Sequence, residues 1–226
     1  MTERTGLARE LRTPRAAAVA GILFAAMMAT MILLVGPNGA TIGSDSTSWV
    51  TTASTRQSVS LALTLVPFAG IAFLWFIGVI RSHLGAREDK FVSTVFLGSG
   101  LLFVACLFSA AAVRGVALTL YPVTGPVSVD TVQLIDALGA SLLTTFASRM
   151  AAVFIASVTT IAHRTRIVPP WLTVCGYACS LALLVSPPGV PLVLLVFPAW
   201  VLVLSIQILV VTMRPDSPGD LNTPLI

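Results

Sequence analysis

The feature that most constrains this chain is a series of long stretches almost free of charged residues. A helix needs roughly 20 apolar residues to cross about 30 Å of hydrocarbon, because each residue advances it by about 1.5 Å. Six stretches approach or reach that length, at residues 16–35, 59–80, 91–113, 142–161, 171–185 and 191–211. Of the 226 residues 56% are hydrophobic and 10% charged, whereas about a quarter are charged in soluble domains. We therefore expect an integral membrane protein.

The apolar stretches predict the fold class as well as the environment. They are continuously apolar and do not alternate with a period of two, so they indicate helices and not barrel strands. We predict an all-α, polytopic transmembrane bundle of six spans at residues 16–213, in which the fifth span is the shortest. A basic arm at residues 1–15 precedes the bundle, and a flexible polar tail at 214–226 follows it. The first stretch is longer than the apolar region of a cleaved signal peptide, so we expect it to be retained.

The distribution of Lys and Arg predicts the orientation. With six spans both termini lie on one side, and that side carries Arg4, Arg9, Arg12, Arg15, Arg81, Arg87, Lys90, Arg164, Arg166 and Arg214. The other side carries only Arg56 and Arg114. The positive-inside bias places both termini in the cytoplasm of a plasma-membrane protein. We therefore interpret the net charge of +4 as a result of this topology, with the basic residues attracted to anionic lipid heads at the cytoplasmic face. It does not indicate binding to nucleic acid.

Arg149 interrupts the fourth apolar stretch and is the first candidate site residue. A charge within a span is costly, so it is by default a functional candidate. Arg149 lies about 21 Å along the helix axis from His163 at the inner turn, which places it in the outer leaflet. Its head group could reach lipid phosphates, Asp136, Asp130, or a carbonyl freed by Pro67 or Pro198. Ligand or ion binding stays open beside these structural roles.

A second group of charges follows the third span. Arg114 is close in the predicted topology to Asp130 and Asp136, because residues 128–138 are expected to extend the fourth span as a helix. We predict an ion pair of Arg114 with one of the two aspartates on the external side. Such a pair contributes little if it is exposed. Arg114 and Asp136 therefore join Arg149 as candidates for ligand binding or ion pairing.

Rows of small residues predict close helix packing. Gly21, Ala25 and Ala29 share one face of the first span. The third span has a longer row on one face, consisting of Thr94, Gly98, Ala105, Ser109 and Ala112. Small residues let helices approach in lipid, where no hydrophobic force drives them together.

The residue types that catalysis or metal binding needs are missing from the predicted spans. Their cores contain no Asp, Glu or His, and no nucleophile or phosphate-binding motif is present. Cys175 and Cys179 are one turn apart but lack further ligands, so we interpret them as packing residues. His83 and His163 lack a metal-ligand spacing and suit solvated helix ends. We predict no enzyme, no cofactor and no metal site.

Several segments carry a resemblance to a known group. The turn RSHLGAREDKF and the segments RMAAVF, RTRIVPPWL and VFPAW are similar to those of multi-pass membrane proteins of actinobacteria, over spans two to six. The resemblance implies a six-span bundle in an actinobacterial plasma membrane. It implies no particular activity, although Arg149 falls within a matching segment.

Two functions remain open from the sequence. The first is an interaction, accessory or structural component of a membrane complex, with other membrane subunits as partners; the small-residue rows and short loops favour it. The second is a small carrier or channel for an anion or amphiphile, which Arg149 and the proline-containing spans favour.

Overall fold

The computed structural model describes residues 12–35, 52–84, 90–124, 128–164, 169–188 and 190–213. Within these ranges the chain is helical and contains no strand. The helices are α2 (Arg12–Val35), α4 (Ala53–Leu84), α5 (Lys90–Thr124), α6 (Val129–Ser141), the π-helix η3 (Leu142–Ala147), α7 (Ser148–Arg164), α8 (Pro170–Val185), the 3₁₀-helix η4 (Pro191–Leu195) and α9 (Val196–Met213). Most of the predicted arm at 1–15 and the whole tail at 214–226 lie outside the described residues.

In the described part of the chain, five helical segments are long and apolar enough to cross a membrane. They are Ala16–Val35, Ala53–Arg81, Phe91–Leu120, Val129–Arg164 and Leu192–Met213. The fourth combines α6, η3 and α7, so residues 128–138 extend the predicted span as expected, with the hydroxyl of Ser128 accepting from the amide of Thr131 at the helix start. The fifth predicted stretch forms α8, whose 16 residues make it shorter than the others. The chain is thus an all-helical, multi-pass membrane protein.

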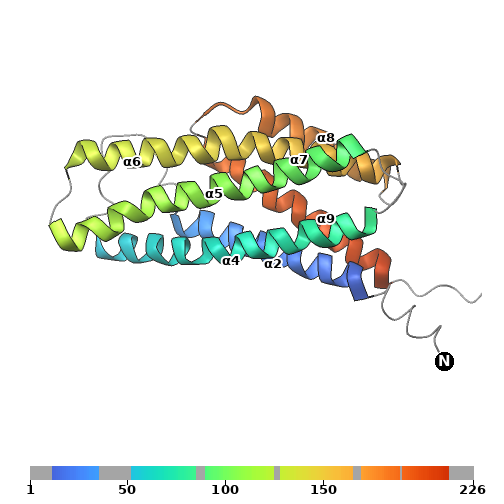
Figure 1. Ribbon diagram of the computed structural model, residues 1–226, viewed down its shortest axis with the longest axis horizontal. Helices are drawn as coiled ribbons and strands as arrows, with labels where there is room; N and C mark the ends of the chain where they lie inside the picture. Colours follow the sequence, from blue (N-terminus) through green and yellow to red (C-terminus); the bar gives the residue numbers. More distant parts are fainter. Residues whose placement is uncertain are drawn as a thin grey trace, which may run out of the picture.

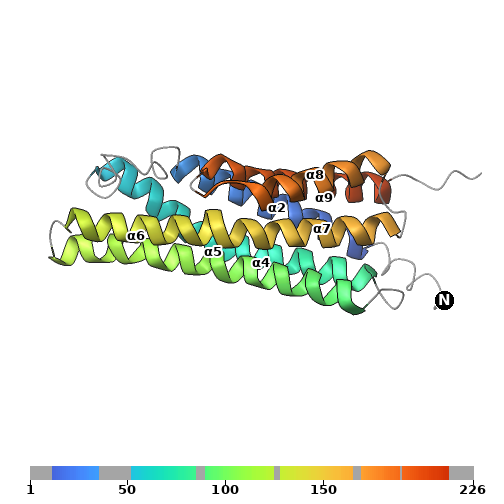
Figure 2. The same cartoon turned by 90° about the horizontal axis from the view of Figure 1, so that it is seen from above.

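The helices lie roughly along one common axis (Figures 1 and 2). Helix α2 packs between α4 and α9, and α5 packs against both α4 and α7. Helix α8 packs mainly against α7 and has much less contact with α9. The bundle is therefore continuous from α9 through α2, α4, α5 and α7 to α8.

A cluster of phenylalanines fills the middle of the bundle. Phe73 of α4 lies at its centre, with its ring centroid 4.6 Å from that of Phe24, 5.4 Å from Phe103, 5.1 Å from Phe154 and 5.5 Å from Phe197. These rings come from α2, α4, α5, α7 and α9. All five are almost completely buried, and several pairs adopt the edge-to-face geometry that aromatic rings prefer. This phenylalanine cluster joins the five helices at one level.

At one end of the bundle three helices form an extension. Helix α6 lies there beside the end of α5, at the end of the bundle opposite the start of α2 (Figures 1 and 2). Val59, Ala117, Val132 and Ile135 form a separate small apolar core in this region. With 35 residues, α5 is about 52 Å long, well beyond the roughly 30 Å of a hydrocarbon core.

The two small-residue rows have different surroundings. Gly21 is buried, and a Cβ atom there would meet Ser205 of α9 and lie 2.9 Å from the ring of Phe76. In contrast, the row on α5 faces away from the other described helices: Thr94, Ala105, Ser109 and Ala112 are exposed, and a Cβ at Gly98 would meet nothing within 4 Å. Close packing is therefore seen at Gly21 of the first span. For the row on the third span it stays a prediction, because the buried face of α5 carries other residues, namely Phe96, Gly100, Phe103 and Leu107.

A glycine also sets the distance between α7 and α8. A Cβ atom at Gly176 would collide with the hydroxyl of Thr159 and lie 3.2 Å from its Cβ. We predict that Gly176→Ala pushes α8 away from α7 and lowers the free energy of unfolding by about 1–3 kcal/mol. Gly98→Ala is the matched control, because open space surrounds that glycine. Unfolding in mixed micelles measures both, and equal stability of the two variants would show that the close approach is unimportant.

Candidate functional site

Arg149 lies at the start of α7, where its guanidinium bonds to backbone carbonyls. Nη1 donates to the carbonyl of Thr144 at 2.6 Å and to the hydroxyl of Ser148 at 3.2 Å. Nη2 donates to the carbonyl of Ser186 at 3.0 Å. The side chain thus joins the fourth predicted span to the end of α8. Neither carbonyl is among the partners that the sequence suggested, which were lipid phosphates, Asp136, Asp130 and a carbonyl freed by Pro67 or Pro198.

Local helix geometry explains why these two carbonyls accept. In the π-helix η3 the amide of Ser148 donates to Leu143, five residues back, and not to Thr144 as it would in an α-helix. The carbonyl of Thr144 is then available to the hydroxyl of Ser148, at 2.6 Å, and to Arg149. Ser186 follows the last residue of α8, where carbonyls lack helical partners and the helix dipole is negative. A guanidinium can donate hydrogen bonds to both carbonyls, and its positive charge is favourable at the negative end of the α8 dipole.

Further polar contacts join α7 and α8. The hydroxyl of Ser180 donates to the carbonyl of Ala152 at 2.8 Å. The hydroxyls of Thr160 and Tyr177 are hydrogen-bonded at 2.9 Å. The hydroxyls of Thr144 and Ser148 donate to carbonyls one turn earlier in their own helical segment. Together with Arg149, these contacts form a polar seam along α8, which has few other neighbours.

Arg114 and Asp136 form an ion pair between α5 and α6. Nε of Arg114 lies 3.7 Å from Oδ1 of Asp136, and the two side chains are only 10% and 19% exposed. Asp130 is exposed at the start of α6. The predicted pairing thus involves Asp136, and it is more buried than an external surface pair. Arg114 and Arg149 occupy separate places and have different partners.

Gly139, which the sequence did not single out, makes room for Arg114. A Cβ atom at this position would lie 3.3 Å from both Cγ and Nε of Arg114. Gly139 follows Asp136 by about one helical turn, so α6 supplies both the charge and the space that position the arginine. The only indication in the sequence was the spacing of Asp136 and Gly139, which places them on one face of a predicted helix.

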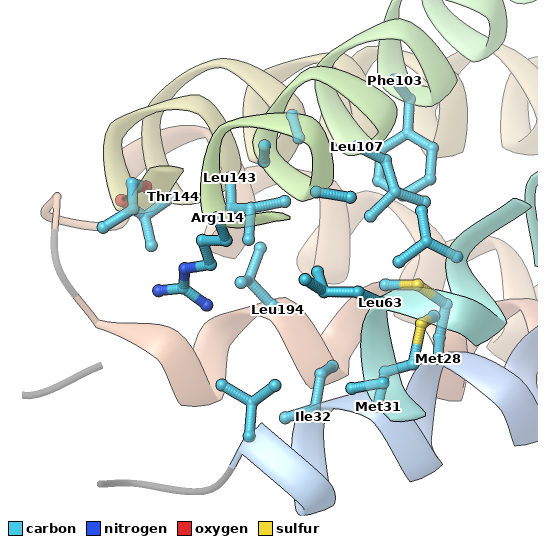
Figure 3. Close-up of a pocket in the computed structure, with 17 residues that line it drawn as sticks. Met28, Met31, Ile32, Leu63, Phe103, Leu107, Arg114, Leu143, Thr144 and Leu194 are labelled. Atoms are coloured by element: carbon cyan, nitrogen blue, oxygen red, sulfur yellow. Dashed lines mark hydrogen bonds between the residues drawn. The ribbon is translucent and has the colours of Figure 1, made fainter. Parts of the chain in front are cut away.

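A cavity lies between the phenylalanine cluster and this ion pair (Figure 3). Its volume is about 120 Å³, and its walls come from α2, α4, α5, α6, η3 and η4. Met31, Leu63, Leu107 and other apolar side chains form most of the lining. Among the described residues that line it, Arg114 is the only charged one. We call this space the Arg114 cavity.

The cysteines and histidines lie apart from Arg149 and Arg114 in the sequence, and we interpret them from the sequence as packing or solvated residues. In the described part of the chain, no group of three or more His, Cys, Asp or Glu residues is arranged to hold a metal ion. Cys175 and Cys179 are free thiols whose sulfur atoms lie 4.0 Å apart. His163 is exposed at the end of α7, and the side chain of His83 lies outside the described residues. Comparison with protein-family models, curated proteins and solved structures gives no match to this chain.

The contacts of Arg149 lead to a prediction about stability. Arg149→Met leaves the carbonyls of Thr144 and Ser186 without the guanidinium in an apolar environment. We expect the free energy of unfolding to fall by about 2–3 kcal/mol. Arg149→Lys keeps the positive charge and should recover part of this loss. Recovery should be incomplete, because an ammonium cannot reproduce the planar fork of donors. Unfolding in mixed micelles measures these changes.

Arg164→Met provides the control for Arg149. Arg164 ends the same helix and is exposed, so its loss should change stability by no more than about 0.5 kcal/mol. If Arg149→Met were as stable as Arg164→Met, the carbonyl contacts would not hold the helices together.

The buried ion pair leads to a second prediction. Asp136→Asn leaves Arg114 without a counter-charge in a largely buried position, which we expect to cost about 3 kcal/mol of unfolding free energy. Asp130→Asn on the same helix removes an exposed charge and should have almost no effect. The same unfolding measurement compares the two, and similar losses would refute a role for the pair.

Proposed function

We propose that this chain is a non-enzymatic, six-span protein of the plasma membrane that acts as an interaction or accessory component of a membrane complex. Other membrane-spanning subunits are the proposed partners, and anionic lipid heads contact its cytoplasmic face. A relationship to actinobacterial multi-pass proteins is part of the proposal and adds no activity.

Two features support six spans with cytoplasmic termini. Helix α8 is short, but its polar seam holds it alongside α7 (Figure 2), as expected of a span at the edge of the bundle. At about 24 Å it can cross a locally thinned bilayer. The basic residues then lie mostly on the side of the termini, in agreement with the positive-inside bias.

The outward row on α5 is the observation that carries the proposed interaction. Small residues at this face would let another helix approach closely in lipid, and Gly98 has open space around it. In the corresponding row of the first span, Gly21 packs against α9 and α4. We infer that the row on α5 serves the same purpose toward a helix outside this chain.

Transport through Arg149 has less support. The guanidinium bonds to Thr144, Ser148 and Ser186, so binding an anion would compete with contacts that join two helices. The phenylalanine cluster fills the middle of the bundle, where a conducting path would need polar groups or water.

Photo-crosslinking in native membranes tests the proposed interaction. A photoreactive amino acid replaces Gly98 in the full chain, and the products are resolved by mass spectrometry. We expect crosslinking to one defined membrane protein, or to a second copy of this chain. Gly78 of α4 is the matched control position, because it is exposed and a Cβ there also meets nothing within 4 Å. Lipid adducts alone at both positions, or the same proteins at both, would refute the docking face.

A further inference from the structure

We propose that the Arg114 cavity binds a single-chain amphiphile with a carboxylate head group. The carboxylate would lie at Arg114, and the apolar chain would point toward Phe103. This site is separate from the outward row on α5, so it does not depend on the proposed interaction.

The shape of the cavity agrees with such a ligand. Phe103 and Arg114 both line it and lie at opposite ends of the view in Figure 3. They are eleven residues apart on α5, or about 16 Å along the helix axis. An elongated molecule with an apolar tail and one polar end therefore fits the direction from the phenylalanine cluster to the cation.

The lining and size favour an apolar chain. A dry engineered cavity of about 150 Å³ lined by Leu, Ile and Phe binds benzene, and the present cavity has a volume of about 120 Å³. Met28, Met31 and Leu107 belong to its lining, and methionine side chains adapt readily to irregular ligands. The space suits several methylene groups of one chain and is too small for the two chains of a phospholipid.

The position of Arg114 favours a carboxylate. Only 8% of this residue is exposed, and it projects from α5 at the end of the cavity (Figure 3). Asp136 and Gly139 position it from α6. Asp136 approaches Nε but does not line the cavity. A guanidinium presents several N–H donors in a planar fork that matches the two oxygens of a carboxylate.

Calorimetric titration into the full chain in phosphatidylcholine nanodiscs tests this site, with empty nanodiscs as the reference. The probes are straight-chain carboxylates from butanoate to decanoate, together with octanol. We expect affinity to rise about fourfold per methylene and to level off when the cavity is full, whereas simple partition into the bilayer continues to rise. Octanoate should bind about tenfold more tightly than octanol, because only the carboxylate pairs with Arg114.

Two neighbouring alanines give a matched pair of variants. Ala111 lines the cavity, and Ala112 is exposed on the outer face of α5. Ala111→Leu should weaken octanoate binding about tenfold by filling the space, and Ala112→Leu should leave it unchanged. Equal effects of the two changes would overturn the assigned location.

A charge variant tests the role of Arg114. Replacing Arg114 with Gln and Asp136 with Asn together removes both charges, so that neither is left alone in the apolar interior. This variant should bind octanoate no better than octanol. Unchanged preference for octanoate in the variant, or no preference in the unmodified chain, would overturn the proposal.

Discussion

The requirement that backbone polar groups find partners without water governs this structure. Within the hydrocarbon, helices satisfy this requirement internally, and each departure from regular helix needs a specific compensation. The π-helix η3 shifts the amide of Ser148 to Leu143, and Arg149 and Ser148 then bond to the carbonyl of Thr144. The end of α8 exposes the carbonyl of Ser186, and the same arginine reaches it. One cation therefore compensates two irregularities and joins the helices that contain them.

The bundle combines two modes of packing. Phenylalanines from five helices interlock around Phe73 in the middle of the bundle. Helix α8 contributes no ring to this cluster and is held to α7 by hydrogen bonds and by the close approach at Gly176. Because lipid is as apolar as these side chains, shape complementarity and hydrogen bonds hold the helices together. This explains why a short, peripheral helix depends on polar contacts.

The π-helix also links the two arginines. It follows α6, which carries Asp136 and Gly139, and precedes α7, which carries Arg149. A π-turn holds one more residue than an α-turn, so it rotates the preceding helix relative to the following one. This rotation sets which face of α6 meets Arg114. The contacts of Arg149 and the position of the Arg114 cavity thus depend on the same six residues, Leu142–Ala147.

The sequence by itself determined the helical class, the approximate limits of the apolar segments and the special status of Arg149, because hydrocarbon thickness and the cost of charge act on composition and length alone. It also indicated that Arg114 pairs with Asp130 or Asp136, since their segments adjoin along the chain, and the structure selects Asp136. Only the tertiary structure decided the acceptors of Arg149, the outward direction of the row on α5, and the cavity beside Arg114. These depend on how each helix is rotated about its axis, and in lipid both faces of a helix are apolar, so hydrophobicity does not distinguish the buried face.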